Sequence, residues 1–135
     1  MSQNPFQNKN SNKNQSLGAA FKHATCGILI LIRTEKNARF HLIATIVVII
    51  MAVYLKVTLL DWIFLSIAIL LVWITEALNT ALENVFDLLQ PNYDPRVKKG
   101  KDISAAAVLM AALLSVIIGL LVLGPPLLEI VKKTP

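Results

Sequence analysis

Apolar residues occur along this chain in long, nearly uninterrupted stretches. The clearest stretches cover residues 42–55, 62–74 and 103–123, and the last of them contains no charged residue. Stretches of this kind are typical of helices that cross a membrane, where every face of the helix meets an apolar environment. The pattern therefore predicts an all-α, integral membrane protein with three transmembrane helices, over about 40–57, 59–89 and 103–123.

The first of these stretches is short for a bilayer. At about 1.5 Å per residue, residues 42–55 extend over about 21 Å of a hydrocarbon core about 30 Å thick. Arg39 and Lys56 flank the stretch, and long basic side chains can reach the membrane surfaces from the ends of a short span. A spanning helix is therefore still the favoured interpretation.

The remaining segments differ in character. Residues 1–16 are rich in Asn, Gln, Ser and Lys, which predicts a disordered polar tail. Residues 17–33 mix apolar and polar positions, which favours an N-terminal amphipathic surface helix. Gly124-Pro125-Pro126 is expected to end the third span and to leave 125–135 as a short C-terminal tail. The membrane domain would thus occupy residues 17–124.

The composition agrees with a membrane protein and excludes an ordinary soluble enzyme. Hydrophobic residues make up 56% of the 135 residues and charged residues only 16%, against about 45–50% and about 25% in a soluble domain. The net charge is +5. Its basic residues gather before residue 41 and in the 91–102 loop, beside the apolar stretches, which marks a cytoplasmic side rather than a nucleic-acid surface. We expect a multi-pass protein of the bacterial inner (cytoplasmic) membrane, with its N-terminus and the 91–102 loop in the cytoplasm.

Four polar residues near the end of the second span form one stripe. At 100° per residue, Glu76, Asn79, Glu83 and Asp87 lie in a narrow sector of the helix, and Glu76 is the deepest in the membrane. A carboxylate inside a span is costly unless it is paired or hydrated. The plain structural interpretations are an ion pair for Glu76, an interhelical hydrogen bond for Asn79 and a solvated helix end for Asp87.

A lysine and an acid lie level with this stripe. Lys101 and Asp102 are placed where the third span begins, and Asp102 can also act there as a helix N-cap. The neighbouring Lys98 and Lys99 are adequately explained as cytoplasmic positive charge. Carboxylates and a lysine at one membrane surface favour binding of a polyphosphate with Mg²⁺, which is usually held by one or two carboxylates plus phosphate oxygens. The glycine-rich loops of soluble nucleotide-binding folds do not occur in the chain.

These motifs resemble those of the prokaryotic diacylglycerol kinase family, which includes the undecaprenol kinases. The resemblance is carried by E-x-x-N-[ST]-A-[IL]-E-x(3)-D at residues 76–87, by Lys-Asp-Ile-Ser-Ala-Ala-Ala-Val at residues 101–108, and by E-x-N-x-R-x-H at residues 35–41. It covers residues 17–124. The resemblance implies a three-span membrane lipid kinase that forms a homotrimer with active sites shared between protomers. It also implies ATP as phosphoryl donor and Mg²⁺ as the metal.

The resemblance assigns roles to particular residues. Glu76 would be the catalytic base for the lipid hydroxyl, although the sequence alone would allow Glu76 and Glu83 to exchange roles. Glu35 and Glu83 would hold the metal that bridges the ATP phosphates, and they would contact ATP together with Lys101 and Asp102. The residues expected to bind or orient the lipid are Asn37, Arg39, His41 and Asn79.

Alternatives remain open at this stage. The acceptor would be diacylglycerol, giving phosphatidic acid, or undecaprenol, giving undecaprenyl phosphate. Ser16, Lys22 and His23 occupy positions where some family members carry arginine and aromatic residues, which leaves the contacts of the surface helix undefined. A small proton-coupled transporter would require only Glu76, and a non-catalytic assembly subunit would leave the whole acidic stripe without a role.

Overall fold

The computed structural model describes residues 17–133, and this part of the chain forms four α-helices. They are α1 (Leu17–Thr34), α2 (Lys36–Tyr54), α3 (Leu59–Leu89) and α4 (Pro95–Lys133). The predicted all-α class is confirmed, whereas the predicted tail at 1–16 lies outside the described residues. All four helices are long and apolar enough to cross a membrane, as judged by length and composition alone.

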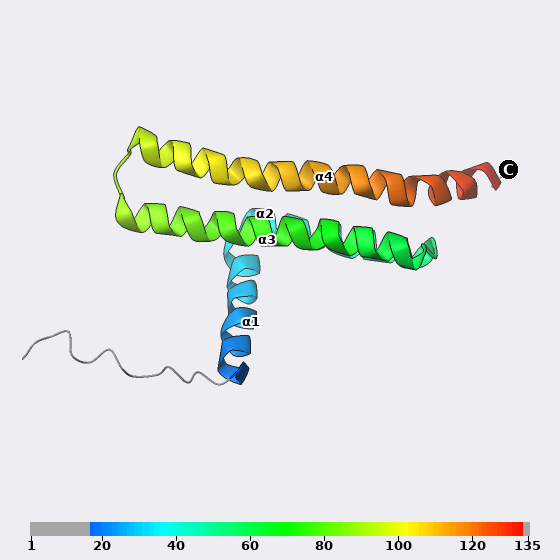
Figure 1. The fold of residues 1–135 in the computed structure, drawn as a ribbon, viewed down its shortest axis with the longest axis horizontal. Coiled ribbons are helices and arrows are strands. Elements are labelled where there is room, and N and C mark those ends of the chain that lie inside the picture. The colour runs from blue at the N-terminus through cyan, green and yellow to red at the C-terminus, as the bar shows by residue number, and fades with distance from the viewer. Residues whose placement is uncertain (1–16, 134–135) are drawn as a thin grey trace, which may run out of the picture.

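Three of the helices lie along a common direction and the fourth does not. In Figure 1, α3 and α4 run antiparallel side by side, α2 packs along α3, and α1 extends away from them crosswise. The most extensive packing is between α3 and α4. The bundle of α2, α3 and α4 therefore forms the body of the molecule, and α1 leaves it at one side.

The α3–α4 interface follows a spacing of three and four residues. On α3 the buried residues recur in this way and include two of the predicted site residues: Leu65, Ala68, Val72, Glu76 and Asn79. The facing positions of α4 are mostly small, among them Ser104, Ala111 and Ser115, and small residues allow membrane helices to approach closely. The Ser115 hydroxyl donates a 2.9 Å hydrogen bond to the Ala68 carbonyl.

The connection between α2 and α3 is short because both helix ends are capped. The N–H of Lys56 donates to the Val53 carbonyl and the N–H of Val57 to the Ala52 carbonyl, which is the Schellman arrangement. Lys56 occupies the left-handed position of this motif, with φ 52°. The Thr58 side chain then caps α3 in a capping box with Asp61. The antiparallel arrangement of α2 and α3 is thus encoded in a few residues.

Few large side chains of this bundle are buried. A small apolar cluster forms near the α2–α3 turn, around Ala52, Leu65 and Leu123. Most of the other large apolar side chains on all four helices are exposed. Such exposure is unfavourable in water but not among lipid tails, which are as apolar as the side chains themselves. The fold is therefore one that needs a membrane or further protein around it.

Two expected helix boundaries are wrong. The predicted 91–102 loop is shorter, because α4 begins at Pro95, and Asp102 therefore lies inside the helix and does not cap it. Asp94 has that role: its carboxylate accepts a 2.7 Å hydrogen bond from the Arg96 backbone N–H. Proline is favoured at the first position of a helix, where its missing N–H has no partner in any case. The side-chain hydrogen bond from Arg96 also lowers the pKa of Asp94 to about 2.

The helix of the predicted third span does not end at Gly124-Pro125-Pro126. Helix α4 continues through both prolines to Lys133, so most of the predicted C-terminal tail is helical. Proline has a φ compatible with a helix, and its cost there lies in lost backbone hydrogen bonds and local crowding. Membrane helices tolerate this cost when neighbouring groups and local adjustments satisfy the freed carbonyls.

Candidate active site

The inner half of the polar stripe of α3 is buried in the bundle, whereas Glu83 is half-buried and Asp87 is exposed. The side chains of Glu76, Asn79 and Ser104 are only 2%, 7% and 9% exposed, and they are the buried polar residues of the described chain. Ser104 Oγ lies 2.6 Å from Asn79 Oδ1, and Asn79 Nδ2 donates to Glu83 Oε1 at 3.0 Å. A continuous row of hydrogen bonds thus links α4 to two residues of the stripe. Asn79 therefore does form the interhelical hydrogen bond that was its plain structural interpretation. This bond is one part of a longer row that also includes Glu83.

Glu76 does not take part in this row of hydrogen bonds. Its Oε2 atom is buried and has no hydrogen-bond partner among the described residues. Glu76 lines a cavity of about 270 Å³ together with Asn37, His41 and Asn79. An ion pair, the plain structural interpretation, is therefore not what holds this side chain. A buried carboxylate oxygen beside a cavity is free to accept a proton or a hydrogen bond from a bound molecule.

Two further carboxylates act on Glu76. The charges of Glu35 and Glu83 both bear on it electrostatically. Glu35 is the single residue between α1 and α2 and has an extended backbone. Glu35 also lines a second cavity of about 610 Å³ between α1 and α3. The fold therefore brings Glu35, which is distant in the sequence, within electrostatic range of Glu76 on α3.

Lys101, the lysine predicted to bind ATP, lies at the end of the bundle where α3 is joined to α4. Lys101 Nζ forms an ion pair with Asp87, which joins the start of α4 to the last turns of α3. Asp102 is exposed and instead pairs with Lys98 one turn earlier, at 2.8 Å. Arg39 is exposed on α2, with its Nε directed to the Glu35 carbonyl, and it does not line the cavity of Glu76.

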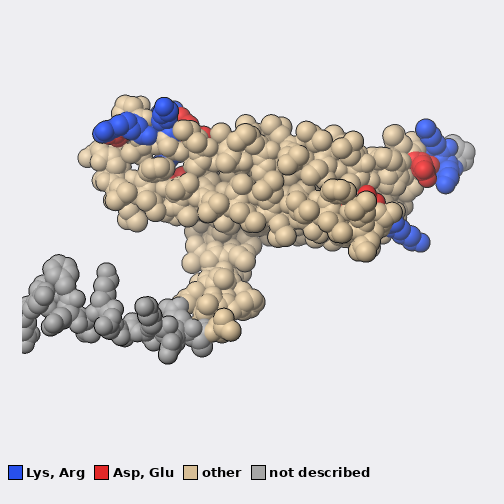
Figure 2. All heavy atoms as spheres, in the orientation of Figure 1, with Lys and Arg blue, Asp and Glu red and all other residues tan. Residues whose placement is uncertain are grey.

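On the visible face of the bundle, charged side chains gather toward its two ends. In Figure 2 the Lys, Arg, Asp and Glu side chains of the visible face gather at the ends of the α2–α4 body, and the surface between them carries almost none. The site residues belong to the end at which α3 passes into α4. An uncharged middle between two charged ends is the surface that a membrane-spanning body requires.

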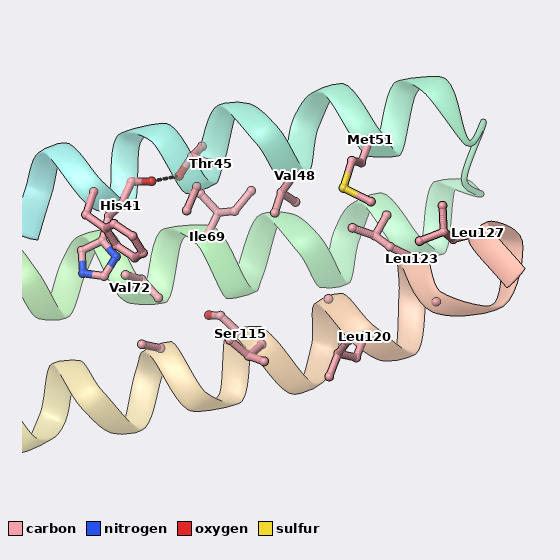
Figure 3. A pocket seen from close by; sticks show the side chains of 16 residues that line it. His41, Thr45, Val48, Met51, Ile69, Val72, Ser115, Leu120, Leu123 and Leu127 are labelled. Carbon is pink, nitrogen blue, oxygen red and sulfur yellow. Dashed lines mark hydrogen bonds between the residues drawn. The ribbon is translucent and has the colours of Figure 1, made fainter.

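An apolar groove leads away from the polar cavity. It has a volume of about 400 Å³, and Figure 3 shows it between α2, α3 and α4, from His41 at one end to Leu127 at the other. Phe40, His41 and Ala112 line both the groove and the cavity of Glu76. The two spaces therefore adjoin, and together they offer a polar end and a long apolar end.

Two contacts of this site were not anticipated from the sequence. One is Ser104, whose small polar side chain faces α3. The sequence signal for this contact is a small polar residue three positions after Lys101, on a helix whose interface residues are small. The other is the contact of Gly100 with the Phe86 ring, where an added Cβ would lie 2.7 Å from Cζ. No sequence signal marks that pair, since it depends on how closely α3 and α4 approach.

The residues present suit a hard divalent cation. Residues 17–133 contain no group of three or more His, Cys, Asp or Glu side chains that could hold a metal by themselves. Carboxylates near one another, without a complete cage, match Mg²⁺, which keeps waters and relies on phosphate oxygens for part of its coordination. Glu35 and Glu83 are both half-buried carboxylates, the ligand type that Mg²⁺ prefers.

The bundle combines one buried carboxylate, Glu76, with further acids and with Lys101 at one end, an arrangement that suits chemistry at a membrane surface. The sequence pattern of the family described as "Prokaryotic diacylglycerol kinase" matches residues 22–123. The chain belongs to this family. It is accordingly a lipid kinase, a phosphotransferase of the diacylglycerol or undecaprenol kinase kind.

Individual relatives agree with this assignment. The chain is similar to the undecaprenol kinase of Bacillus subtilis (strain 168), with 37% identity over 80% of this chain and 88% of that protein. It is 38% identical to the diacylglycerol kinase of Synechocystis sp., over 85% of this chain and 66% of that protein. With the diacylglycerol kinase of Escherichia coli (strain K12) it shares 33% identity over 56% of this chain and 62% of that protein.

Proposed function

We propose that this protein transfers the γ-phosphoryl group of ATP, with Mg²⁺, to the hydroxyl of diacylglycerol or undecaprenol, and that Glu76 is the catalytic base. One observation carries the assignment of the base. Glu76 is almost fully buried, its Oε2 has no partner, and it lines a cavity that adjoins an apolar groove. A lipid hydroxyl placed in that cavity would meet a carboxylate with an unoccupied acceptor atom.

In the proposed reaction the lipid oxygen attacks the γ-phosphorus while its proton passes to the Glu76 carboxylate. A new O–P bond forms, the bond between the γ-phosphorus and the β–γ bridging oxygen breaks, and ADP leaves. Phosphoryl transfer depends mainly on positioning and on charge stabilisation. A positioned base contributes a further factor of about 10²–10⁴. Asn37, His41 and Asn79 line the same cavity, which supports their proposed role in orienting the acceptor.

The nucleotide is proposed to lie at the end of the bundle where α3 and α4 are joined. Lys101 would exchange its pairing with Asp87 for an ATP phosphate, and Asp102 would lie near the nucleotide. Glu35 and Glu83 would hold Mg²⁺, which, when bound, neutralises phosphate charge. The electrostatic proximity of both acids to Glu76 supports this division of roles. The exposed position of Arg39 leaves it to contact a headgroup from outside the cavity.

The hydrocarbon part of the lipid is proposed to occupy the apolar groove. The groove begins at His41 beside the cavity of Glu76 and continues along the bundle (Figure 3). A lipid bound there would place its hydroxyl at the polar end and its chain at the apolar end. The similarity to the Bacillus subtilis undecaprenol kinase, which extends over most of both chains, makes undecaprenol the acceptor to test beside diacylglycerol.

We also propose the membrane arrangement and the assembly. With α1 lying crosswise to the bundle (Figure 1), α1 would rest at the membrane surface and α2, α3 and α4 would form three spans. Basic residues before residue 41 and at the start of α4 favour a cytoplasmic position for the active site. The many exposed apolar side chains of one chain leave surface for a homotrimer within the bacterial inner membrane.

The test is phosphorylation of a lipid by purified protein in mixed micelles. Diacylglycerol and undecaprenol are offered in parallel with γ-labelled ATP, with Mg²⁺ or with EDTA. Label in a lipid product that disappears with EDTA is the expected result, and the faster product identifies the acceptor. Absence of label from both lipids, with protein that is folded and binds ATP, would contradict the proposed acceptors. Label that persists in EDTA would contradict the role of the metal.

A further inference from the structure

We infer that Ser104 is a positioning residue for Glu83: through Asn79 it fixes which oxygen of the Glu83 carboxylate faces the metal. This inference rests on the proposed role of Glu83 as a Mg²⁺ ligand. It concerns a residue of α4 that touches neither the cavity of Glu76 nor the proposed nucleotide, and that acts through one intermediate side chain.

The hydrogen bonds in this row have a fixed direction. A carboxylate oxygen only accepts, so the group of Asn79 that lies 3.0 Å from Glu83 Oε1 must be the amide NH₂. The amide oxygen of Asn79 is thereby turned toward Ser104 Oγ, 2.6 Å away. Because an amide oxygen also only accepts, the Ser104 hydroxyl must donate. The row therefore runs from Ser104 through Asn79 to Glu83 without ambiguity.

Ser104 has a second acceptor within reach, and this does not change the direction. The Lys101 carbonyl lies 2.9 Å from Ser104 Oγ. The hydroxyl has one hydrogen, and the bond to Asn79 is the shorter of the two. The bond to Lys101 is a turn-to-turn contact that any helical serine can make, whereas Asn79 Oδ1 has no other hydrogen-bond donor identified among residues 17–133. Asn79 and Ser104 are both buried, so bulk water competes little for this hydrogen bond.

The effect on Glu83 follows from the number of its oxygens. One oxygen, Oε1, is engaged by the Asn79 amide, which leaves Oε2 as the atom available to a cation. Side chains that hydrogen-bond to a metal-ligating residue orient that residue and fix how it binds the metal. Losing such a side chain typically costs about 10–100-fold in metal affinity or activity. Without Ser104, Asn79 would lose the donor that sets its amide orientation, and Glu83 would rotate more freely.

The experiment measures metal binding without turnover. The full-length protein in detergent is mixed with a saturating, non-hydrolysable ATP analogue, Mg²⁺ is added in steps, and the rise in Tm is recorded. We expect Ser104→Ala to raise the Mg²⁺ concentration at half-maximal effect by about tenfold or more. Ser115→Ala is the matched control, because Ser115 also lies on α4 and donates to α3, at the Ala68 carbonyl. It should leave the Mg²⁺ midpoint unchanged.

A second measurement asks whether Ser104 acts through Glu83. In the double variant Ser104→Ala with Glu83→Gln, the serine substitution should add no further shift, since non-additivity is the sign of a shared interaction. An unchanged Mg²⁺ midpoint in Ser104→Ala, or an equal shift in Ser115→Ala, overturns the inference while the proposed function stands. If the wild-type protein phosphorylates lipid but shows no Mg²⁺-dependent rise in Tm, the metal role of Glu83 fails and the inference fails with it. If wild-type protein phosphorylates no lipid yet binds Mg²⁺ through Glu83 as described, the proposed function fails separately.

Discussion

Replacing Glu76 by glutamine should abolish most of the activity and stabilise the fold. Glutamine has nearly the same shape as glutamate but carries no charge and cannot accept the substrate proton. Glu76 is 2% exposed, and its Oε2 has no partner. The charges of Glu35 and Glu83 bear on it as well. The burial of a charge and its repulsion by Glu35 and Glu83 are unfavourable for a carboxylate in the folded protein and are relieved in the neutral amide, whereas the missing hydrogen-bond partner is not.

The expected loss of rate and the expected gain in stability can both be estimated from these features. Removing a positioned base typically lowers the rate by about 10²–10⁴-fold, which corresponds to about 3–5 kcal/mol of transition-state stabilisation. A buried polar group without a partner costs about 1–3 kcal/mol, and more when it is charged. The amide keeps the first cost and removes the additional cost of the charge, so we expect Glu76→Gln to raise the free energy of unfolding by about 1 kcal/mol or more. The same side chain would thus oppose folding and support catalysis.

The assay compares lipid phosphorylation and thermal unfolding in the same detergent. Glu129→Gln is the control, because Glu129 is an exposed acid near the far end of α4, and it should change neither quantity. Binding of ATP should be retained in Glu76→Gln, since Glu76 is assigned to the lipid hydroxyl. This separates loss of the base from loss of the nucleotide site.

Two results would refute the reasoning. If Glu76→Gln keeps more than about a tenth of the wild-type rate, the effect is too small for a general base, and Glu83 becomes the candidate. If the variant is less stable than the wild type, the carboxylate has a favourable partner in the membrane-embedded protein, and the role deduced from its unpaired oxygen is wrong.

Three further substitutions test other parts of the structure. Gly100→Ala should destabilise the protein by about 1–3 kcal/mol, because its Cβ would lie 2.7 Å from Phe86 Cζ; combining it with Phe86→Leu should restore part of the Tm, and a full effect in the double variant would contradict the contact. Gly119→Leu should raise the KM for lipid but not for ATP, because Gly119 lines the apolar groove and has open space where a side chain would begin; an unchanged lipid KM would exclude the groove as the chain site. Lys56→Gly should raise the free energy of unfolding by about 0.5–1 kcal/mol, since glycine adopts the left-handed conformation without strain, and a lower Tm would show that the lysine itself stabilises the turn.

The helices themselves were accessible from the sequence because membrane insertion depends on local composition. A stretch of apolar residues crosses or lines a bilayer regardless of what it later contacts, so the helices at 59–89 and 17–34 follow closely from hydropathy. The predicted end at Gly124-Pro125-Pro126 failed for the complementary reason. Whether proline ends a helix depends on its surroundings, and α4 continues to Lys133.

The sequence alone determined that Glu76, Asn79 and Glu83 share one face of a helix, because a period of 3.6 residues fixes their relative directions, and its motifs identified the family. Only the tertiary structure decided which of these groups are satisfied. It placed Ser104 against Asn79, left Glu76 Oε2 without a partner, and joined the polar cavity to the apolar groove. Hydrogen bonds and cavities of this kind arise between helices that are distant in the sequence, and they depend on separations of a few tenths of an ångström that no local pattern encodes.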